Sequence, residues 1–311
     1  DNLYWFGRYL ERVEAILRIV RALVAKALDP DAPTRVDHGP AERLQRLLVS
    51  WDAAPRVVAS SLSLDMAQSA LHDENNYGSA LSNTIAARRA ASSIRERLSP
   101  DVWLLVGRLE NILRKPLGQS AVEAGVLEQS EQALQVIAAI AGFVNENMNR
   151  VAGWNFLDMG RRIERGINTL RFASQFAGDD ADLELLDVLL DLIDSQITYR
   201  SRYLTGATLA PVRDMTLLDA FNPRSVAFQA ARIEEHLAGL PSLRETGMLE
   251  QPRQIALKLK SDLAVEDARR LTGQTIYDYE NRLVSLAIAV ADRYFLHDAS
   301  EPSPGKVRGL A

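Results

Sequence analysis

Apolar residues recur along this chain every three or four positions, the spacing that places them on one face of an α-helix. Near the N-terminus such a face carries Phe6, Leu10, Val13, Leu17 and Val20. This pattern predicts a helix to about residue 27, because prolines at 30 and 33 prevent its continuation. Comparable patterns predict helices over about 40–49, 55–71, 76–98, 100–114, 120–148, 153–177, 182–206, 214–221, 224–238, 251–271 and 274–297. No long stretch alternates apolar and polar residues as a strand does, so the expected fold is all-α, a multi-helix bundle.

A short repeat suggests how this bundle is organised. Residues 7–18 and 160–171 match at an offset of 153, with identical residues at Gly7/Gly160, Arg8/Arg161, Glu11/Glu164, Arg12/Arg165, Leu17/Leu170 and Arg18/Arg171. Because this offset is almost half of the 311 residues, we expect one domain over 1–297 built from two related halves, about 1–150 and 151–297. Residues 298–311 have little to bury, which predicts a flexible tail.

The repeated residues form a charged stripe. At 100° per residue, Arg8, Glu11 and Arg12 fall in one sector of the helix, roughly opposite its apolar face. Each glutamate has an arginine three positions before it and another directly after it, and we expect it to pair with both. A glycine inside a helix costs about 1 kcal/mol relative to alanine, a cost that makes sense at Gly7 and Gly160 if a backbone or ligand approaches closely. The stripe therefore predicts a packed or cleft-lining network, with a solvated charged face as the alternative.

Composition and charge narrow the classes of function. Five of the 36 cationic residues are lysine and the rest are arginine, whose planar guanidinium binds carboxylate or phosphate in a bidentate manner. The alternative explanation of this excess of arginine over lysine is a GC-rich genome. A net charge of −5 argues against nucleic-acid binding. The longest apolar runs, such as 136–144, are well short of the roughly 20 residues that cross a bilayer. We therefore expect no nucleic acid, no membrane and a cytoplasmic location.

Metal and cofactor chemistry finds little support. Without cysteine there is no disulfide, thiolate zinc site or cysteine nucleophile, and none of the four histidines belongs to a Glu-x-x-His pair of the di-iron type. Asp187, Asp191 and Asp194 fall on one face of a predicted helix, where they could hold Mg²⁺ against a diphosphate or simply form its polar face. No phosphate-binding glycine loop or nucleophile elbow is present. We expect no metal and no cofactor in this chain, with ATP and Mg²⁺ only on a partner domain.

A second group of arginines lies around residue 200. Tyr199, Arg200 and Arg202 are expected at the end of one helix, and Arg224 follows Asn222 at the start of another. An arginine at a helix start can bind an anion together with the free N–H groups there. The alternative is that these long side chains only cover the edge of the core.

Five segments together resemble the bacterial alpha-E family. The first is Asn2-Leu3-Tyr4-Trp5-Phe6-Gly7-Arg8-Tyr9-Leu10-Glu11-Arg12. The others are Arg-Glu-Arg-Leu-Ser-Pro-Asp-Val-Trp at 95–103; Gly-Trp-Asn-Phe-Leu at 153–157 with Gly160-Arg161 and Glu164-Arg165; Thr-Tyr-Arg-Ser-Arg-Tyr at 198–203; and Leu-Leu-Asp at 217–219 with Asn-Pro-Arg-Ser at 222–225 and Phe-Gln at 228–229. They occur in the family's order over about residues 1–242. One departure is Arg-Ala-Ala-Ser at 89–92, where the family tends to show Glu-Asn-Ala-Arg.

The resemblance implies an all-helical domain associated with circularly permuted ATP-grasp ligases and transglutaminase-like peptidases, and hence with peptide or amide bond formation. Some members are fused behind an ATP-grasp domain, and a chain that opens at Asp1 rather than Met fits an excised domain. The first hypothesis is therefore a helical partner of such a ligase that binds a carboxylate or phosphate in an arginine-rich cleft. The alternatives are an isoprenoid-synthase-like, Mg²⁺-dependent enzyme at the three aspartates and a purely structural scaffold.

The first hypothesis assigns roles to particular residues. Glu11 and Glu164 orient the arginines or act as a general base, and are the catalytic candidates. The anion-binding candidates are Arg8, Arg12, Arg161, Arg165, Arg200, Arg202 and Arg224. Trp5, Gly7, Gly160, Tyr199 and Asn222 are expected to support them.

Overall fold

The computed structural model describes residues 1–27, 39–55, 63–117, 122–204, 206–241 and 247–295. Within these ranges the chain forms thirteen α-helices and no strand, which confirms the all-α class. They are α1 (Asn2–Ala27), α2 (Pro40–Ser50), α3 (Ser63–His72), α4 (Ala80–Ser92), α5 (Pro100–Arg114), α6 (Val122–Asn147), α7 (Ala152–Phe176), α8 (Leu183–Leu192), α9 (Gln196–Arg202), α10 (Leu209–Arg213), α11 (Val226–Ala238), α12 (Gln251–Val265) and α13 (Gly273–Tyr294). The predicted tail at 298–311 lies outside the described residues.

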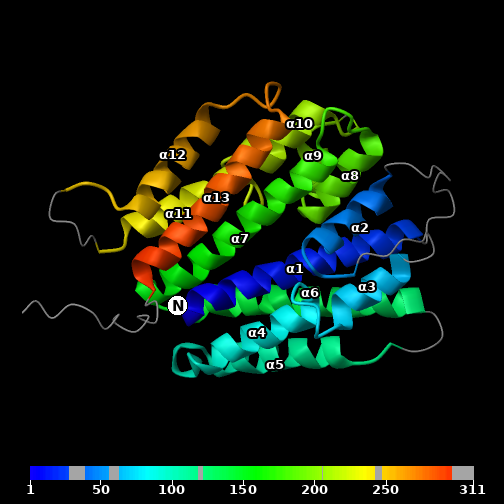
Figure 1. Ribbon diagram of the computed structural model, residues 1–311, viewed down its shortest axis with the longest axis horizontal. Helices are drawn as coiled ribbons and strands as arrows, with labels where there is room; N and C mark the ends of the chain where they lie inside the picture. The colour runs from blue at the N-terminus through cyan, green and yellow to red at the C-terminus, as the bar shows by residue number, and fades with distance from the viewer. Residues whose placement is uncertain (28–38, 56–62, 118–121, 205, 242–246, 296–311) are drawn as a thin grey trace, which may run out of the picture.

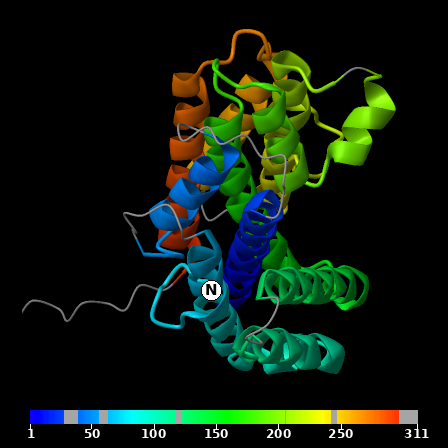
Figure 2. The same cartoon turned by 90° about the vertical axis from the view of Figure 1, so that its right-hand side faces the viewer.

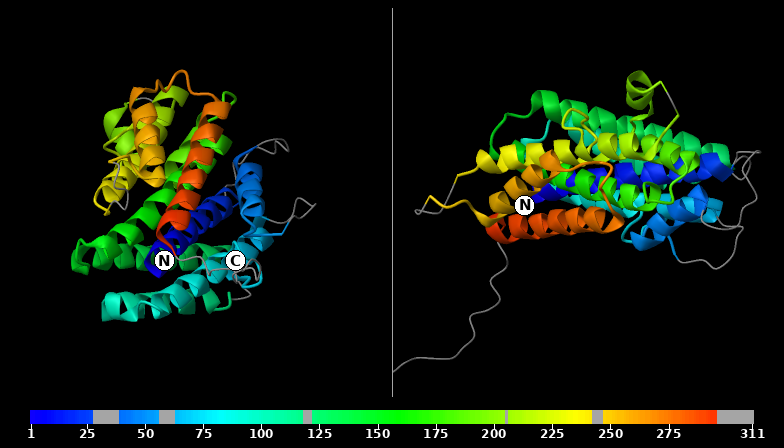
Figure 3. Two further views of the ribbon diagram at one scale, coloured as in Figure 1. Left: turned by 60° about the vertical axis from the view of Figure 1, so that its left-hand side comes forward. Right: turned by 90° about the horizontal axis from the view of Figure 1, so that it is seen from above.

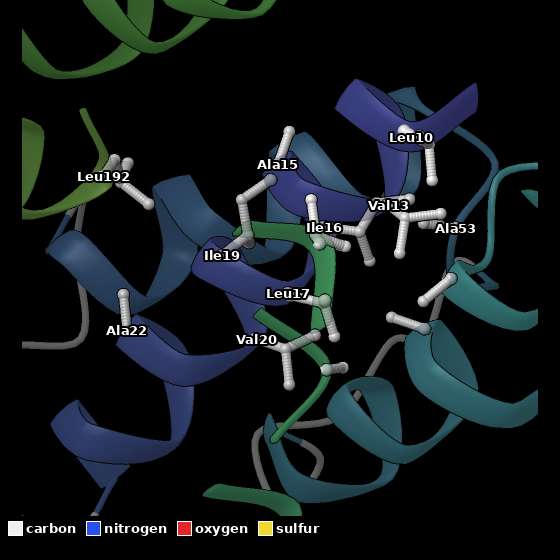
Figure 4. Packing of buried hydrophobic residues seen from close by; sticks show 14 of the residues in the cluster. Leu10, Val13, Ala15, Ile16, Leu17, Ile19, Val20, Ala22, Ala53 and Leu192 are labelled. Carbon is white, nitrogen blue, oxygen red and sulfur yellow. The ribbon is translucent and has the colours of Figure 1, made fainter. Parts of the chain in front are cut away.

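Helix α1 lies at the centre of the molecule. Figure 1 shows α4, α5 and α6 on one side of it and α7, with α11, α12 and α13, on the other. One core surrounds α1, whose Leu10, Val13 and Leu17 are buried within it (Figure 4). A second core lies between α7 and α11–α13. The N-terminus lies beside the end of α13 (Figure 3), where the Tyr4 and Phe295 rings are 5.2 Å apart.

Several helix boundaries differ from the prediction for local reasons. The continuous helix expected over 182–206 is wrong, because Asp194 adopts a left-handed backbone with φ of 54° between α8 and α9. Helix α9 consequently projects from the body of the molecule (Figures 2 and 3). The expected helix over 76–98 begins only at Ala80, where the Ser79 hydroxyl caps the Ser82 N–H, and ends at Ser92. Residues 56–62 of the expected 55–71 helix lie outside the described ranges.

No helix in the described part of the chain combines the length and the apolar character that crossing a bilayer requires.

Two further irregular turns, a 3₁₀ turn at Arg95–Arg97 and a π turn at Asp214–Leu218, complete the described elements. The π turn occupies most of the region where the sequence predicts an α-helix over 214–221.

Candidate functional site

The repeated glycines lie where α1 and α7 cross. A Cβ atom added to Gly7 would lie 2.3 Å from the carbonyl oxygen of Leu157, and one added to Gly160 would lie 2.2 Å from that of Tyr4. Tyr4 and Leu157 are themselves separated by 153 residues, so the two contacts are equivalent under the repeat offset. Both helices therefore need glycine here because each backbone packs directly on the other.

The charged stripes meet reciprocally at this crossing. Glu164 on α7 accepts hydrogen bonds from Arg8 Nε at 2.6 Å and from Arg12 Nε at 2.8 Å, both on α1. Glu11 on α1 accepts from Arg161 Nε at 3.1 Å and from Arg165 Nε at 2.9 Å, both on α7. The expectation that each glutamate pairs with arginines of its own helix is therefore wrong. This equivalence concerns α1 and α7. That the whole halves 1–150 and 151–297 are related to each other stays a prediction.

Both carboxylates are removed from solvent. Glu11 is 4% and Glu164 3% exposed, so the stripe is a packed network and not a solvated face. Burial by itself would raise the pKa of Glu164, but the positive charges of Arg8 and Arg12 outweigh it and hold that pKa below its usual value. Glu164 is thus ionised at neutral pH and a weak proton acceptor.

The two sides of the crossing differ in their surroundings. Beside Arg8, Arg12 and Glu164 lies a cavity of about 460 Å³, which we call the Arg12 cavity. Its walls come from α1, α4, α7, α13 and the turns at 51–52 and 77–78. On the other side, Glu11 and Arg165 border a void of only about 20 Å³. The structure brings Arg8 and Arg12 to the cavity, and it does not bring Arg161 and Arg165 there.

The family described as a predicted alpha-helical domain with a conserved ER motif, named Alpha-E, matches residues 1–295. The chain belongs to the Alpha-E family. Two Glu-Arg pairs of this sequence, Glu11-Arg12 and Glu164-Arg165, are those that meet at the crossing. Two more Glu-Arg pairs occur at 42–43 and 96–97.

This Alpha-E chain is also similar to longer mycobacterial proteins. It is 28% identical over 265 residues to the uncharacterized protein Rv2567 of Mycobacterium tuberculosis, and equally to the uncharacterized protein Mb2597 of Mycobacterium bovis. Each alignment covers 78% of this chain and 29% of the relative. The match therefore spans less than a third of each relative's length. No solved structure shows significant similarity to the chain.

The Alpha-E domain contains a second buried charge cluster that the sequence did not reveal. Glu14 accepts hydrogen bonds from Arg18 Nη2 at 2.9 Å and from Arg224 Nη1 at 2.6 Å, and Arg165 Nη2 lies 3.6 Å from it. Burial opposes ionisation of Glu14, yet these arginines, Arg224 first, hold its pKa far below the usual value. The position equivalent to Glu14 in the repeat is Ile167, so comparing the two copies gave no signal for it.

Of the arginines expected around residue 200, only Arg224 reaches the crossing, on its Glu11 side. Arg224 was expected to begin a helix, but Ser225 caps α11, which begins at Val226, and Arg224 pairs with Glu14. Arg200 is exposed on the projecting α9, and Arg202 pairs with Asp219 at 2.8 Å. Within the described residues, neither Arg200 nor Arg202 forms a hydrogen bond or ion pair with Glu11 or Glu164.

The two supporting residues of this region hold loops in place. The Tyr199 hydroxyl accepts the Thr208 N–H at 3.1 Å and lies 3.4 Å from the Gly206 carbonyl. The Asn222 amide donates to the Ser195 hydroxyl and the Met215 carbonyl, and its oxygen accepts the Arg224 N–H at 3.0 Å. Asn222 thus positions Arg224 through its backbone.

The three aspartates proposed for Mg²⁺ do not share one helical face. Asp194 lies beyond the end of α8 and pairs with Arg18 at 3.3 Å, whereas Asp191 pairs with Arg21 at 3.3 Å. No group of three or more histidine, aspartate or glutamate side chains in the described ranges is arranged to hold a metal ion. The structure therefore does not assemble the metal site that the isoprenoid-synthase alternative requires.

The Arg12 cavity includes a polar residue that the repeat does not share, Asn168. Asn168 and Arg171 follow Glu164 at four and seven positions along α7, so they share its face. Arg171 pairs with Glu280 at 2.7 Å and lies over the Trp51 ring. The repeat equivalent of Asn168 is Ala15, which explains why the repeat did not single it out, whereas its spacing from Glu164 was a usable signal.

Proposed function

We propose that this Alpha-E domain binds a carboxylate- or phosphate-bearing ligand in the Arg12 cavity, as the helical partner of an ATP-grasp ligase that forms peptide or amide bonds. The observation that carries the binding proposal is that Arg8 and Arg12 share a single carboxylate. Among the charged residues that line the cavity, Arg8, Arg12 and Arg171 outnumber Glu164 and Asp52 by one, which leaves one positive charge at the wall.

Arg12 is the residue best placed to contact such an anion. Its side chain is 34% exposed, and its hydrogen bonds to Glu164 use Nε and Nη2. Nη1 makes no hydrogen bond to any residue that the structure describes. Because the guanidinium is already oriented by Glu164, binding an anion costs little further side-chain entropy.

The proposed role of Glu164 is to position the arginines. A carboxylate with a lowered pKa is a poor general base near neutral pH, so the proposal assigns Glu164 to orientation and leaves proton transfer to the partner. ATP and Mg²⁺ would likewise be bound by the ligase, in the cytoplasm, with a transglutaminase-like peptidase as a second class of partner. The resemblance to alpha-E proteins supports this partnership.

Calorimetric titration tests the binding part of the proposal. With N-acetyl-leucine and inorganic phosphate as probes, Arg12→Gln should weaken binding of the preferred anion at least about tenfold, because a charge-assisted hydrogen bond is lost. The matched control is Arg293→Gln. Arg293 is 29% exposed and donates two hydrogen bonds of 2.9 Å to Glu250, away from the Arg12 cavity, so its loss should leave binding unchanged. Equal binding by wild type and Arg12→Gln, or no binding of either anion, contradicts the proposal.

The partnership has its own test. An ATP-grasp ligase from the same genome should form a complex with the domain on gel filtration and release ADP faster in its presence. Arg12→Gln should lower that stimulation, whereas Arg293→Gln should not. If no complex forms and ADP release is unchanged, the ligase partnership is wrong even where anion binding persists.

A further inference from the structure

The Arg12 cavity contains a buried amide without a partner. Asn168 is 5% exposed and lines the cavity, yet its side chain makes no hydrogen bond to any residue that the structure describes. Asn83, the other buried asparagine that lines this cavity, donates to the carbonyls of Tyr77 and Ser79. The polar atoms of the Asn168 amide are not sealed off from solvent, so the group is accessible and its hydrogen-bonding capacity is unused by the described protein. Asn168 borders the Arg12 cavity as well as the void of about 20 Å³ beside Glu11. Only the cavity, which Arg8 and Arg12 also line, has room for a ligand that could pair with this amide.

The chemistry of the amide narrows the class of ligand. A carboxamide offers one donor group and one acceptor, which together match the N–H and C=O of a secondary amide. Asn168 lies one turn of α7 after Glu164, about 6 Å along the helix axis. A ligand that contacts both Arg12 and Asn168 thus has its anionic group only a few bonds from its amide.

A third part of the cavity is apolar. Helix α13 contributes Val284, Ala287 and Ile288 to the wall, and Ile288 is 56% exposed. An aliphatic group packed there would remove apolar surface of both partners from water.

We infer that the Arg12 cavity recognises an N-acylated amino acid or the C-terminal residue of a peptide. The carboxylate of this ligand lies at Arg12, the ligand's amide at Asn168 and its apolar side chain against α13. This inference rests on the proposed anion-binding function and specifies the ligand of that same site.

Three small probes separate the contacts. N-acetyl-leucine carries the carboxylate and the amide; its ester analogue replaces the N–H by oxygen; N-acetyl-leucinamide lacks the carboxylate. The wild-type protein should bind N-acetyl-leucine about tenfold more tightly than the ester, as expected for one buried hydrogen bond and the repulsion that replaces it. Asn168→Leu has nearly the same shape without the amide, and it should bind the two about equally. N-acetyl-leucinamide should bind weakly to both proteins.

A second readout observes Asn168 directly. Its side-chain NH₂ signals, assigned by their absence in Asn168→Leu, should shift when N-acetyl-leucine is added to the ¹⁵N-labelled domain. If the wild type binds ester and amide equally and these signals do not move, the inference is wrong, while anion binding stands. If none of the three probes and no phosphate binds, the proposed function fails, and the inference fails with it.

Discussion

The backbone of Gly160 lies directly on the carbonyl oxygen of Tyr4, so closely that a Cβ on this glycine would come within 2.2 Å of that oxygen. Gly7 contacts Leu157 in the equivalent way. These two contacts set the distance between α1 and α7. They thereby bring each glutamate within hydrogen-bond reach of the arginines on the other helix.

Gly160→Ala should lower the free energy of unfolding by about 2 kcal/mol. The added methyl group forces the two helices apart, which costs more free energy than the higher helix propensity of alanine restores. Denaturant melts measure the change. Gly142→Ala is the control, since nothing lies within 4 Å of a Cβ there and the residue is also inside a helix; it should stabilise by up to about 1 kcal/mol. Two variants of equal stability would show that the helices are not in direct contact at Gly160.

Glu164→Ala should lower the free energy of unfolding by more than about 2 kcal/mol, because Arg8 and Arg12 lose their shared carboxylate. This value is below that of a fully buried pair since Arg12 is partly exposed. Glu235→Ala removes an exposed partner of Arg232 and should change stability by less than about 0.5 kcal/mol. A Glu164→Ala protein as stable as Glu235→Ala would mean that the network contributes nothing to folding.

The stability contributed by Glu164 should depend on pH in a defined direction. Its pKa is lower in the folded protein than its usual value of 4.5, so the folded state holds the proton less tightly than the unfolded state does. The contribution is complete above pH 4.5 and is lost as the pH falls through the folded pKa. The stability difference between wild type and Glu164→Gln, measured by denaturant melts between pH 3 and 7, should therefore be constant near neutrality and shrink in acid. A difference that stays constant or widens in acid contradicts this assignment.

Asn168→Leu should leave the free protein as stable as wild type or raise its unfolding free energy by about 1 kcal/mol, because a buried amide without a partner is replaced by an apolar group of similar shape. Asn222→Leu, which removes three hydrogen bonds at another buried site, should cost at least about 2 kcal/mol. Thermal and denaturant melts compare the two. If Asn168→Leu destabilises as much as Asn222→Leu, Asn168 has a structural role that the observed contacts do not explain.

The two equivalent arginines Arg8 and Arg161 should differ in function. Arg8 borders the Arg12 cavity, whereas Arg161 reaches Glu11 away from it. Arg8→Gln should weaken the binding of N-acetyl-leucine at least several-fold, and Arg161→Gln should leave it within about twofold, although both remove one arginine from a buried glutamate. Isothermal titration of the two variants checks this, and equal losses would place the ligand elsewhere.

Much of the architecture follows from the sequence by itself. Helical periodicity depends on neighbours three and four positions away, so Leu10, Val13 and Leu17 were sufficient to predict α1 and its buried face. The glycines inside the stripe predicted a close approach, because only a backbone or ligand contact justifies their cost. The break at Asp194 was not predictable in this way, since a left-handed residue between α8 and α9 leaves the apolar spacing almost unchanged.

The choice of charge partners was decided by the tertiary structure. A glutamate flanked by arginines on its own helix has the same sequence whether it pairs within that helix or across to another. At Glu11 and Glu164 the crossing of α1 and α7 decides the outcome. The repeat supplied the same glycine, arginine and glutamate residues to both sides of that crossing. The packing of α13 beside Arg12 and of Arg224 beside Glu14 made the two sides different. Local spacing thus determined which residues form the network, whereas contacts between distant segments decided which side of it opens into a cavity.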